Sequence, residues 1–106
     1  MKNVTEDTIK LAISKGYYKP MTFDNRPYED IIYAEHCLIQ KWLEETHNIL
    51  IEIKIDRTSE PKYLYEIYMY ENFGNWTRLD KHSEFFIYYT QYEALEEAIK
   101  ESLNHI

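Results

Sequence analysis

The residues best suited to chemistry are the neighbours His36 and Cys37 and, further along the same predicted helix, His47. Imidazole and thiolate groups bind zinc and serve in catalysis. Neighbours on a helix point about 100° apart, and the helical rise separates His36 from His47 by about 16 Å. No H-E-x-x-H or C-x-x-C spacing occurs. We therefore expect no metal site, with Cys37 buried as a small hydrophobic residue and the histidines on the surface.

The sequence also offers no constellation for nucleophilic or acid–base catalysis. Cys37 lies mid-helix rather than at a helix N-terminus, where a thiolate would be stabilised. The consecutive carboxylates Glu44/Glu45 and Glu96/Glu97 diverge into solvent on their helices. The chain has two glycines, too few for a phosphate-binding loop. We expect a non-enzymatic protein without catalytic residues or a cofactor; an enzyme would need a second chain to complete its site.

Tyrosine is the residue type in clear excess, with eleven in 106 residues. In a strand, Tyr68 and Tyr70 would leave the isoleucine-bearing face and lie on the opposite face, where we expect Tyr88 to join them. Aromatic side chains are enriched where proteins meet, and they also stack unpaired bases. The predicted interaction surface consists of Tyr68, Tyr70, Phe73, Trp76 and Tyr88.

Two alternatives compete with an exposed aromatic surface. The amino-terminal segment needs an apolar partner for Ile9, Ala12 and Ile13, and it could fold across the tyrosine face and cover it. Trp76 could turn back onto the core instead of anchoring a partner. The sequence alone leaves both alternatives open.

Two helices are predicted in the first half of the chain. Residues 6–15 follow Thr5, a suitable N-cap, and Gly16 provides the C-terminal cap. The apolar side chains Ile9, Ala12 and Ile13 of this helix are expected to face inward. Apolar residues at helical spacing predict a second helix over residues 29–47, ended by Asn48.

The last helix has the clearest signals. Thr90 and Glu93 form a capping box. Its inward residues recur at helical spacing and are Tyr92, Leu95, Ala98, Ile99, Ser102, Leu103 and Ile106. The charged residues expected on its outer face are Glu93, Glu96, Glu97, Lys100 and Glu101.

Strands are predicted between these helices. Residues 49–56 alternate isoleucine with mostly polar side chains, which indicates a half-buried strand. Residues 63–70 form a second strand, antiparallel to the first because the connection is short. A third strand is expected at residues 85–89, and residues 76–79 could add a short one.

Charge suggests the register of the first two strands. One register places Lys54 opposite Glu66, and another places Glu52 there. Unlike charges directly across an antiparallel pair stabilise it by a few tenths of a kcal/mol, and like charges destabilise it similarly. We therefore expect Lys54 opposite Glu66.

The element order predicts an α+β fold, α-α-β-β-β-α, in which a small antiparallel sheet of about three strands carries helices packed on one face. We expect one domain over residues 1–106, with an amino-terminal helix and loop at 1–27 and an α-β-β-β-α core at 28–106. Residues 29–106 share their order with the double-stranded-RNA-binding domain, by topology only. The lysines of that family's last helix are replaced here by Gln91, Glu93, Glu96 and Glu97.

The net charge of −7 comes from two helical regions. Residues 28–48 hold five acidic and one basic side chain, and residues 91–106 hold four acidic and one basic. Neither region offers the basic stripe that duplex binding requires. The single Cys37, the lack of a long apolar window and the polar amino terminus predict a cytoplasmic protein that does not bind membranes.

Two segments resemble a family of short, uncharacterised proteins from phages, prophages and genomes of Bacteroidetes-type bacteria. They are LIQKWLEETHNI at 38–49 and YEALEEA at 92–98. The family reads approximately L-x-Q-K-W-L-R-E in the first segment, and Glu44 replaces its arginine here. The resemblance implies a phage or mobile-element context and transfers no catalytic residue.

We expect a protein-interaction module that binds another protein or a second copy of itself as a homodimer, and no nucleic acid. One alternative is a nucleic-acid mimic that presents the glutamates of the second and last helices. Another is a binder of single-stranded nucleic acid that stacks bases on Tyr68, Tyr70, Trp76 and Tyr88.

Overall fold

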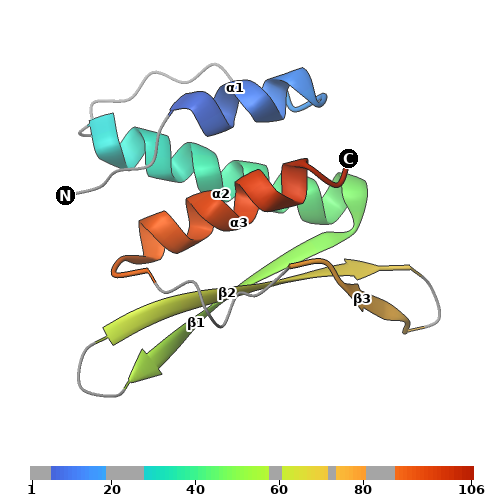
Figure 1. Ribbon diagram of the computed structural model, residues 1–106. Helices are drawn as coiled ribbons and strands as arrows, with labels where there is room; N and C mark the ends of the chain where they lie inside the picture. Colours follow the sequence, from blue (N-terminus) through green and yellow to red (C-terminus); the bar gives the residue numbers. More distant parts are fainter. Residues whose placement is uncertain (1–5, 19–27, 58–60, 72–73, 81–87) are drawn as a thin grey trace.

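The computed structural model describes residues 6–18, 28–57, 61–71, 74–80 and 88–106 (Figure 1). Within these ranges, it contains three helices and a three-stranded antiparallel sheet, so the predicted α+β fold and element order are confirmed. No helix in the same ranges has the length and apolar character needed to cross a membrane. The elements are α1 (Glu6–Ser14), α2 (Tyr28–His47), β1 (Ile49–Arg57), β2 (Pro61–Tyr70), β3 (Trp76–Arg78) and α3 (Gln91–Leu103).

The elements form three layers. Helices α2 and α3 pack side by side on one face of the sheet, and α1 packs on α2 and α3 from the side away from the sheet (Figure 1). The core lies where these layers meet, because the isoleucine face of the sheet and the apolar sides of the helices need one another for burial. Its largest fully buried apolar side chains are Ile39, Leu43, Ile49, Ile67, Leu95, Ile99 and Leu103.

Helix α1 therefore does not cover the tyrosine face of the sheet. That face carries Glu52, Lys54 and Glu66, whose charges would lose water beneath a helix. Ile9 and Ala12 of α1 are buried as predicted, whereas Ile13 is exposed. The prediction for Ile13 was wrong because α1 rests on only two helices, which cover a narrow strip of its surface.

The helix ends follow the predicted capping chemistry. Gly16 after α1 and Asn48 after α2 adopt positive φ angles of 108° and 57°, the left-handed conformation that ends helices. At the start of α3, the Glu93 backbone N–H donates to Thr90 Oγ1 at 3.1 Å. The predicted N-cap Thr5 lies outside the described residues. The sequence therefore predicted these three ends correctly from local chemistry.

The register of β1 and β2 differs from the prediction. The residue opposite Glu66 is Glu52, whereas Lys54 was expected there. Lys54 nevertheless reaches Glu66 along the diagonal, with Nζ 3.0 Å from Oε1. A long side chain can span this diagonal distance, so the attraction between the two charges does not require direct opposition. The prediction was wrong because it treated direct opposition as the only favourable geometry.

The third strand is β3, at the position of the short strand considered at residues 76–79. Tyr68 and Tyr70 of β2 pair with Arg78 and Trp76 of β3. From the expected strand at 85–89, Tyr88 forms an isolated bridge to Tyr63 on the same edge of β2. Residues 85–87 lie outside the described part of the chain. Strand β2 is thus central, and β1 forms an edge of the sheet.

Candidate interaction surface

The sheet face turned away from the helices, here called the reverse face, contains an open hollow of about 360 Å³. Strand alternation brings even-numbered side chains of β1 and β2 to this face. Because Trp76 of β3 pairs with Tyr70, the two side chains share it. The hollow is lined by Leu50, Glu52, Lys54, Glu66, Tyr68 and Trp76.

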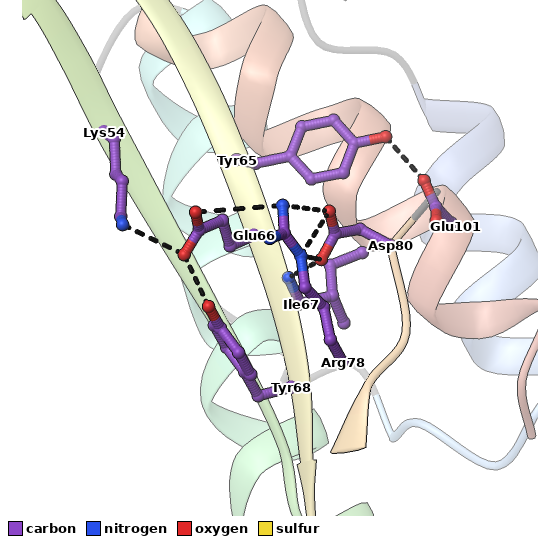
Figure 2. Close-up of polar contacts among 8 residues, drawn as sticks. All are labelled: Lys54, Tyr65, Glu66, Ile67, Tyr68, Arg78, Asp80 and Glu101. Carbon is purple, nitrogen blue, oxygen red and sulfur yellow. Dashed lines mark hydrogen bonds and ion pairs between the residues drawn. The ribbon is translucent and has the colours of Figure 1, made fainter. Parts of the chain in front are cut away.

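Glu66 lies at the centre of the polar contacts on this face (Figure 2). Its Oε1 accepts from the Tyr68 hydroxyl at 2.6 Å and from Lys54 Nζ at 3.0 Å. Arg78 Nη2 is 3.8 Å from its other oxygen. The hydrogen bond from Tyr68, followed by that from Lys54, lowers the pKa of Glu66 below its ordinary value. The Glu66 carboxylate is therefore charged at neutral pH and held from three sides.

Asp80 fixes the third member of this group. The guanidinium of Arg78 donates from Nε and Nη2 to the two carboxylate oxygens of Asp80, at 3.0 to 3.1 Å. The buried Asp80 also accepts from the Ile67 backbone N–H at 2.8 Å (Figure 2). The hydrogen bonds to Asp80 raise the pKa of Arg78 above its ordinary value. We call the residues Lys54, Glu66, Tyr68, Arg78 and Asp80 the reverse-face cluster.

Two aromatic rings stand beside this cluster. Tyr70 and Trp76 contact edge to face, with ring centroids 5.1 Å apart, a favoured aromatic geometry. Trp76 is 51% exposed, and Tyr70 is also exposed. The alternative in which Trp76 returns to the core is therefore wrong. The structure brings Tyr68, Tyr70 and Trp76 of the predicted surface together.

The remaining predicted surface residues do not join this group. Tyr88 lies on the helix side of the sheet, where its ring centroid is 5.9 Å from that of the buried Tyr65. Its face follows from its pairing with Tyr63, since residues directly opposite in a sheet share a face. The prediction that Tyr88 lies beside Tyr68 was wrong. The sequence does not show which residue of β2 pairs with Tyr88, and that pairing decides the face on which Tyr88 lies. Phe73 lies outside the described residues.

The helix side contains polar contacts that the sequence did not predict. His36 on α2 is 0% exposed and Glu96 on α3 is 4% exposed. His36 Nε2 lies 3.3 Å from Glu96 Oε1, which also accepts from the Thr8 hydroxyl of α1 at 3.2 Å. These three residues, the helix-layer cluster, connect all three helices. Burial keeps solutes from reaching them, so their chemistry serves to hold the helices together.

Both surface predictions for this cluster were wrong. His36 was expected on the surface, and Glu96 was placed on the outer face of its helix. A signal for burial existed in the spacing, because His36 precedes the buried Ile39 and Leu43 by three and seven residues. Glu96 stands in the same relation to Ile99 and Leu103. The prediction placed both residues on the surface because histidine and glutamate are polar, and it disregarded their spacing from the apolar residues. A polar group that has a partner can nevertheless occupy a buried position.

Two tyrosines add further ties within the helix side. The Tyr17 hydroxyl donates to Glu35 in a buried contact, and the Tyr17 ring packs edge to face on Trp42 at 5.5 Å. The Tyr65 hydroxyl donates to Glu101 of α3 at 2.6 Å (Figure 2). Burial, aided by the respective carboxylates, raises the pKa of both tyrosines. Both hydroxyls therefore remain protonated donors.

The described residues contain no group of three or more histidine, cysteine, aspartate or glutamate side chains that could hold a metal ion. Cys37 is half-buried and packs against the core. Three of the glutamates considered for nucleic-acid mimicry have internal bonds, since Glu96 meets His36, Glu101 meets Tyr65, and Glu93 accepts from Thr90.

Comparison of the chain with family models, with curated proteins and with solved structures gives no match.

Proposed function

We propose that this protein is a protein-binding module and that it presents the reverse face to its partner. The observation that carries the proposal is the exposed pair Tyr70 and Trp76 beside the hollow lined by Leu50 and Tyr68. Tryptophan and tyrosine dominate binding hot spots because each removes a large apolar area from water and keeps a polar group for a hydrogen bond.

The surface around these rings is already ordered. Glu66 receives hydrogen bonds from Tyr68 and Lys54, and Asp80 holds Arg78 through two of its nitrogens. A partner therefore does not need to immobilise these long side chains itself, which lowers the entropic cost of association. The hollow with its aromatic edge supports binding of a partner side chain of apolar character.

The charges favour a protein over a nucleic acid. Both cations of the reverse-face cluster, Lys54 and Arg78, already contact carboxylates. Phosphate binding would compete with these contacts, on a chain whose net charge is −7. Stacking of bases would also lack Tyr88, which lies on the other side of the sheet. A phage or mobile-element origin, suggested by the resemblance of residues 38–49, belongs to the same proposal, and the neighbouring genes would test it.

Site-specific crosslinking in the native host tests the proposal. A benzophenone amino acid at position 76 should crosslink a protein partner, whereas the same group at the exposed Tyr18 of the α1 end should not. Trp76→Ala should then weaken binding of the purified partner at least about tenfold, and Tyr18→Ala should leave it unchanged. Equal crosslinking from both positions, or binding of a single-stranded oligonucleotide in place of a protein, would overturn it.

A further inference from the structure

The outer edge of β1 is a second surface that could bind a partner, because the direction of its backbone N–H and C=O groups follows from the register of the sheet. The Tyr70 backbone N–H donates to the Asn48 carbonyl at 2.9 Å, and these two residues continue the register of β1 and β2. Hydrogen-bonded positions alternate along an antiparallel strand. Even-numbered residues of β1 therefore bond to β2, and the N–H and C=O groups of Ile51, Ile53 and Ile55 point outward.

This edge lacks two of the features that prevent strands from pairing, a bulge and a proline. The register of β1 with β2 runs without a bulge from Ile49 to Arg57, and the strand contains no proline. Ile55 is 49% exposed and Ile53 is half-buried. In the described part of the chain, the one group bonded to this edge is Gln40, whose Nε2 donates to the Ile51 carbonyl at 3.2 Å. A long and regular edge beside the exposed Ile55 is a template for another strand.

We propose that β1 pairs antiparallel with β1 of a second copy about a two-fold axis at Ile53, which joins the two sheets into one. In this register, Ile53 lies opposite its own counterpart and Ile51 lies opposite Ile55. Glu52 of each copy then lies opposite Lys54 of the other, and this pairing occurs twice. Both charged pairs lie on the reverse face, because residues directly opposite share a face.

The competing registers are less favourable. An axis at Glu52 would oppose two glutamates, and an axis at Lys54 would oppose two lysines. An axis at Ile55 would pair Lys54 with Asp56, but the strands would overlap only from residue 53 onward. The axis at Ile53 combines unlike charges with overlap of the whole strand. The Ile51 carbonyl has a second lone pair, so its bond to Gln40 is compatible with this pairing.

The self-association does not depend on a reverse-face partner, and it can be measured on the purified chain. Sedimentation equilibrium over a range of concentrations should show a monomer–dimer equilibrium. Glu52→Lys places lysines opposite lysines, and Lys54→Glu places glutamates opposite glutamates, so each variant alone should dimerise more weakly by on the order of tenfold. A mixture of the two variants restores both unlike pairs and should recover a heterodimer of wild-type affinity.

Disulfide trapping tests the register itself, with Cys37→Ala as the background. Ile53→Cys should crosslink on oxidation, because two copies of position 53 meet at the axis within disulfide range. Ile55→Cys is the matched control, since its two copies would be separated by four residues of strand, about 13 Å. A monomer at every concentration, failure of the mixed variants to pair, or trapping at 55 instead of 53 would overturn the proposal. Trp76→Ala should leave dimerisation unchanged, which separates this test from that of the reverse face.

Discussion

The helix-layer cluster and the reverse-face cluster use similar groups in different surroundings. In the first, Glu96 contacts His36 and Thr8 with almost no exposure to water. In the second, Glu66 contacts Lys54 and Tyr68 at the edge of an open hollow. Loss of a partner inside the protein leaves a polar group that water cannot reach, whereas water replaces a lost partner at the surface. We therefore assign the first cluster to stability and propose a role in recognition for the open side of the second, which consists of Lys54, Glu66 and Tyr68.

The largest effect is expected from Glu96→Ala, which removes the carboxylate shared by Thr8 and His36. Because both remaining groups are buried, the free energy of unfolding should fall by about 3 kcal/mol. Urea denaturation measures this change. Glu96→Gln, which keeps an acceptor oxygen, should lose less, and Glu97→Ala on the partly exposed side of the same turn should change stability by less than about 0.5 kcal/mol. Equal effects at 96 and 97 would contradict the assignment of the helix-layer cluster to stability.

Asp80→Ala should have the next largest effect, because Asp80 links the reverse face to the buried backbone. The substitution removes the bidentate bond from Arg78 and the acceptor of the Ile67 N–H. We expect a loss of about 2 kcal/mol in thermal or urea unfolding. Asp80→Asn retains an acceptor for the Ile67 N–H and should restore about half of it. An Asp80→Ala variant as stable as wild type would show that β2 does not need this carboxylate.

A smaller difference should separate the two tyrosine–glutamate pairs on opposite sides of β2. Tyr65→Phe removes the buried donor to Glu101 and should cost about 1 kcal/mol, whereas Tyr68→Phe removes the more exposed donor to Glu66 and should cost less than about 0.5 kcal/mol. Both variants keep the aromatic ring and its packing, so each substitution measures the effect of the hydroxyl group alone. Parallel urea titrations compare them, and a larger loss for Tyr68→Phe would reverse our assignment of the two sides.

The smallest effect concerns the pH dependence set by Glu66, whose pKa is lowered in the folded protein. A lowered folded pKa contributes stability above the unfolded pKa, and this contribution is lost as the pH falls through the folded value. Carbon-13 NMR titration of the Glu66 carboxyl should show this low pKa. Tyr68→Phe and Lys54→Met should each raise it, because the tyrosine hydrogen bond and then the hydrogen bond and charge of the lysine lower the pKa. A Glu66 pKa that neither variant changes would contradict the contacts of this cluster.

Local chemistry was sufficient to predict most of the fold. Helix ends depend on a few neighbouring residues, such as Gly16 and Asn48, whose backbone preferences do not require tertiary contacts. The alternation of isoleucines in β1 and the periodicity of α2 and α3 likewise reflect which side of each element is buried. These features identified the helices, the first two strands and the order of the elements before any packing was known, whereas the third strand lies at Trp76–Arg78 and not at the expected residues 85–89.

The candidate surface was predicted in part. Tyr68 and Tyr70 could be placed by alternation along one strand, and Trp76 by its proximity in the chain. Tyr88 could not, because its face depends on which residue of β2 it pairs with. The register of β1 was also not predicted correctly, since Lys54 can form an ion pair with Glu66 from a diagonal position as well as from the position directly opposite.

The sequence by itself determined which segments become helices or strands, since capping and hydrophobic periodicity act over a few residues. Only the tertiary structure decided that α1 covers the helices rather than the sheet, and that His36 and Glu96 meet inside the protein. The physical reason is that a buried carboxylate or imidazole is tolerated only when it has a partner, and here the partners come from different helices. The same packing left Tyr70 and Trp76 uncovered on the reverse face, the surface that we propose binds a partner.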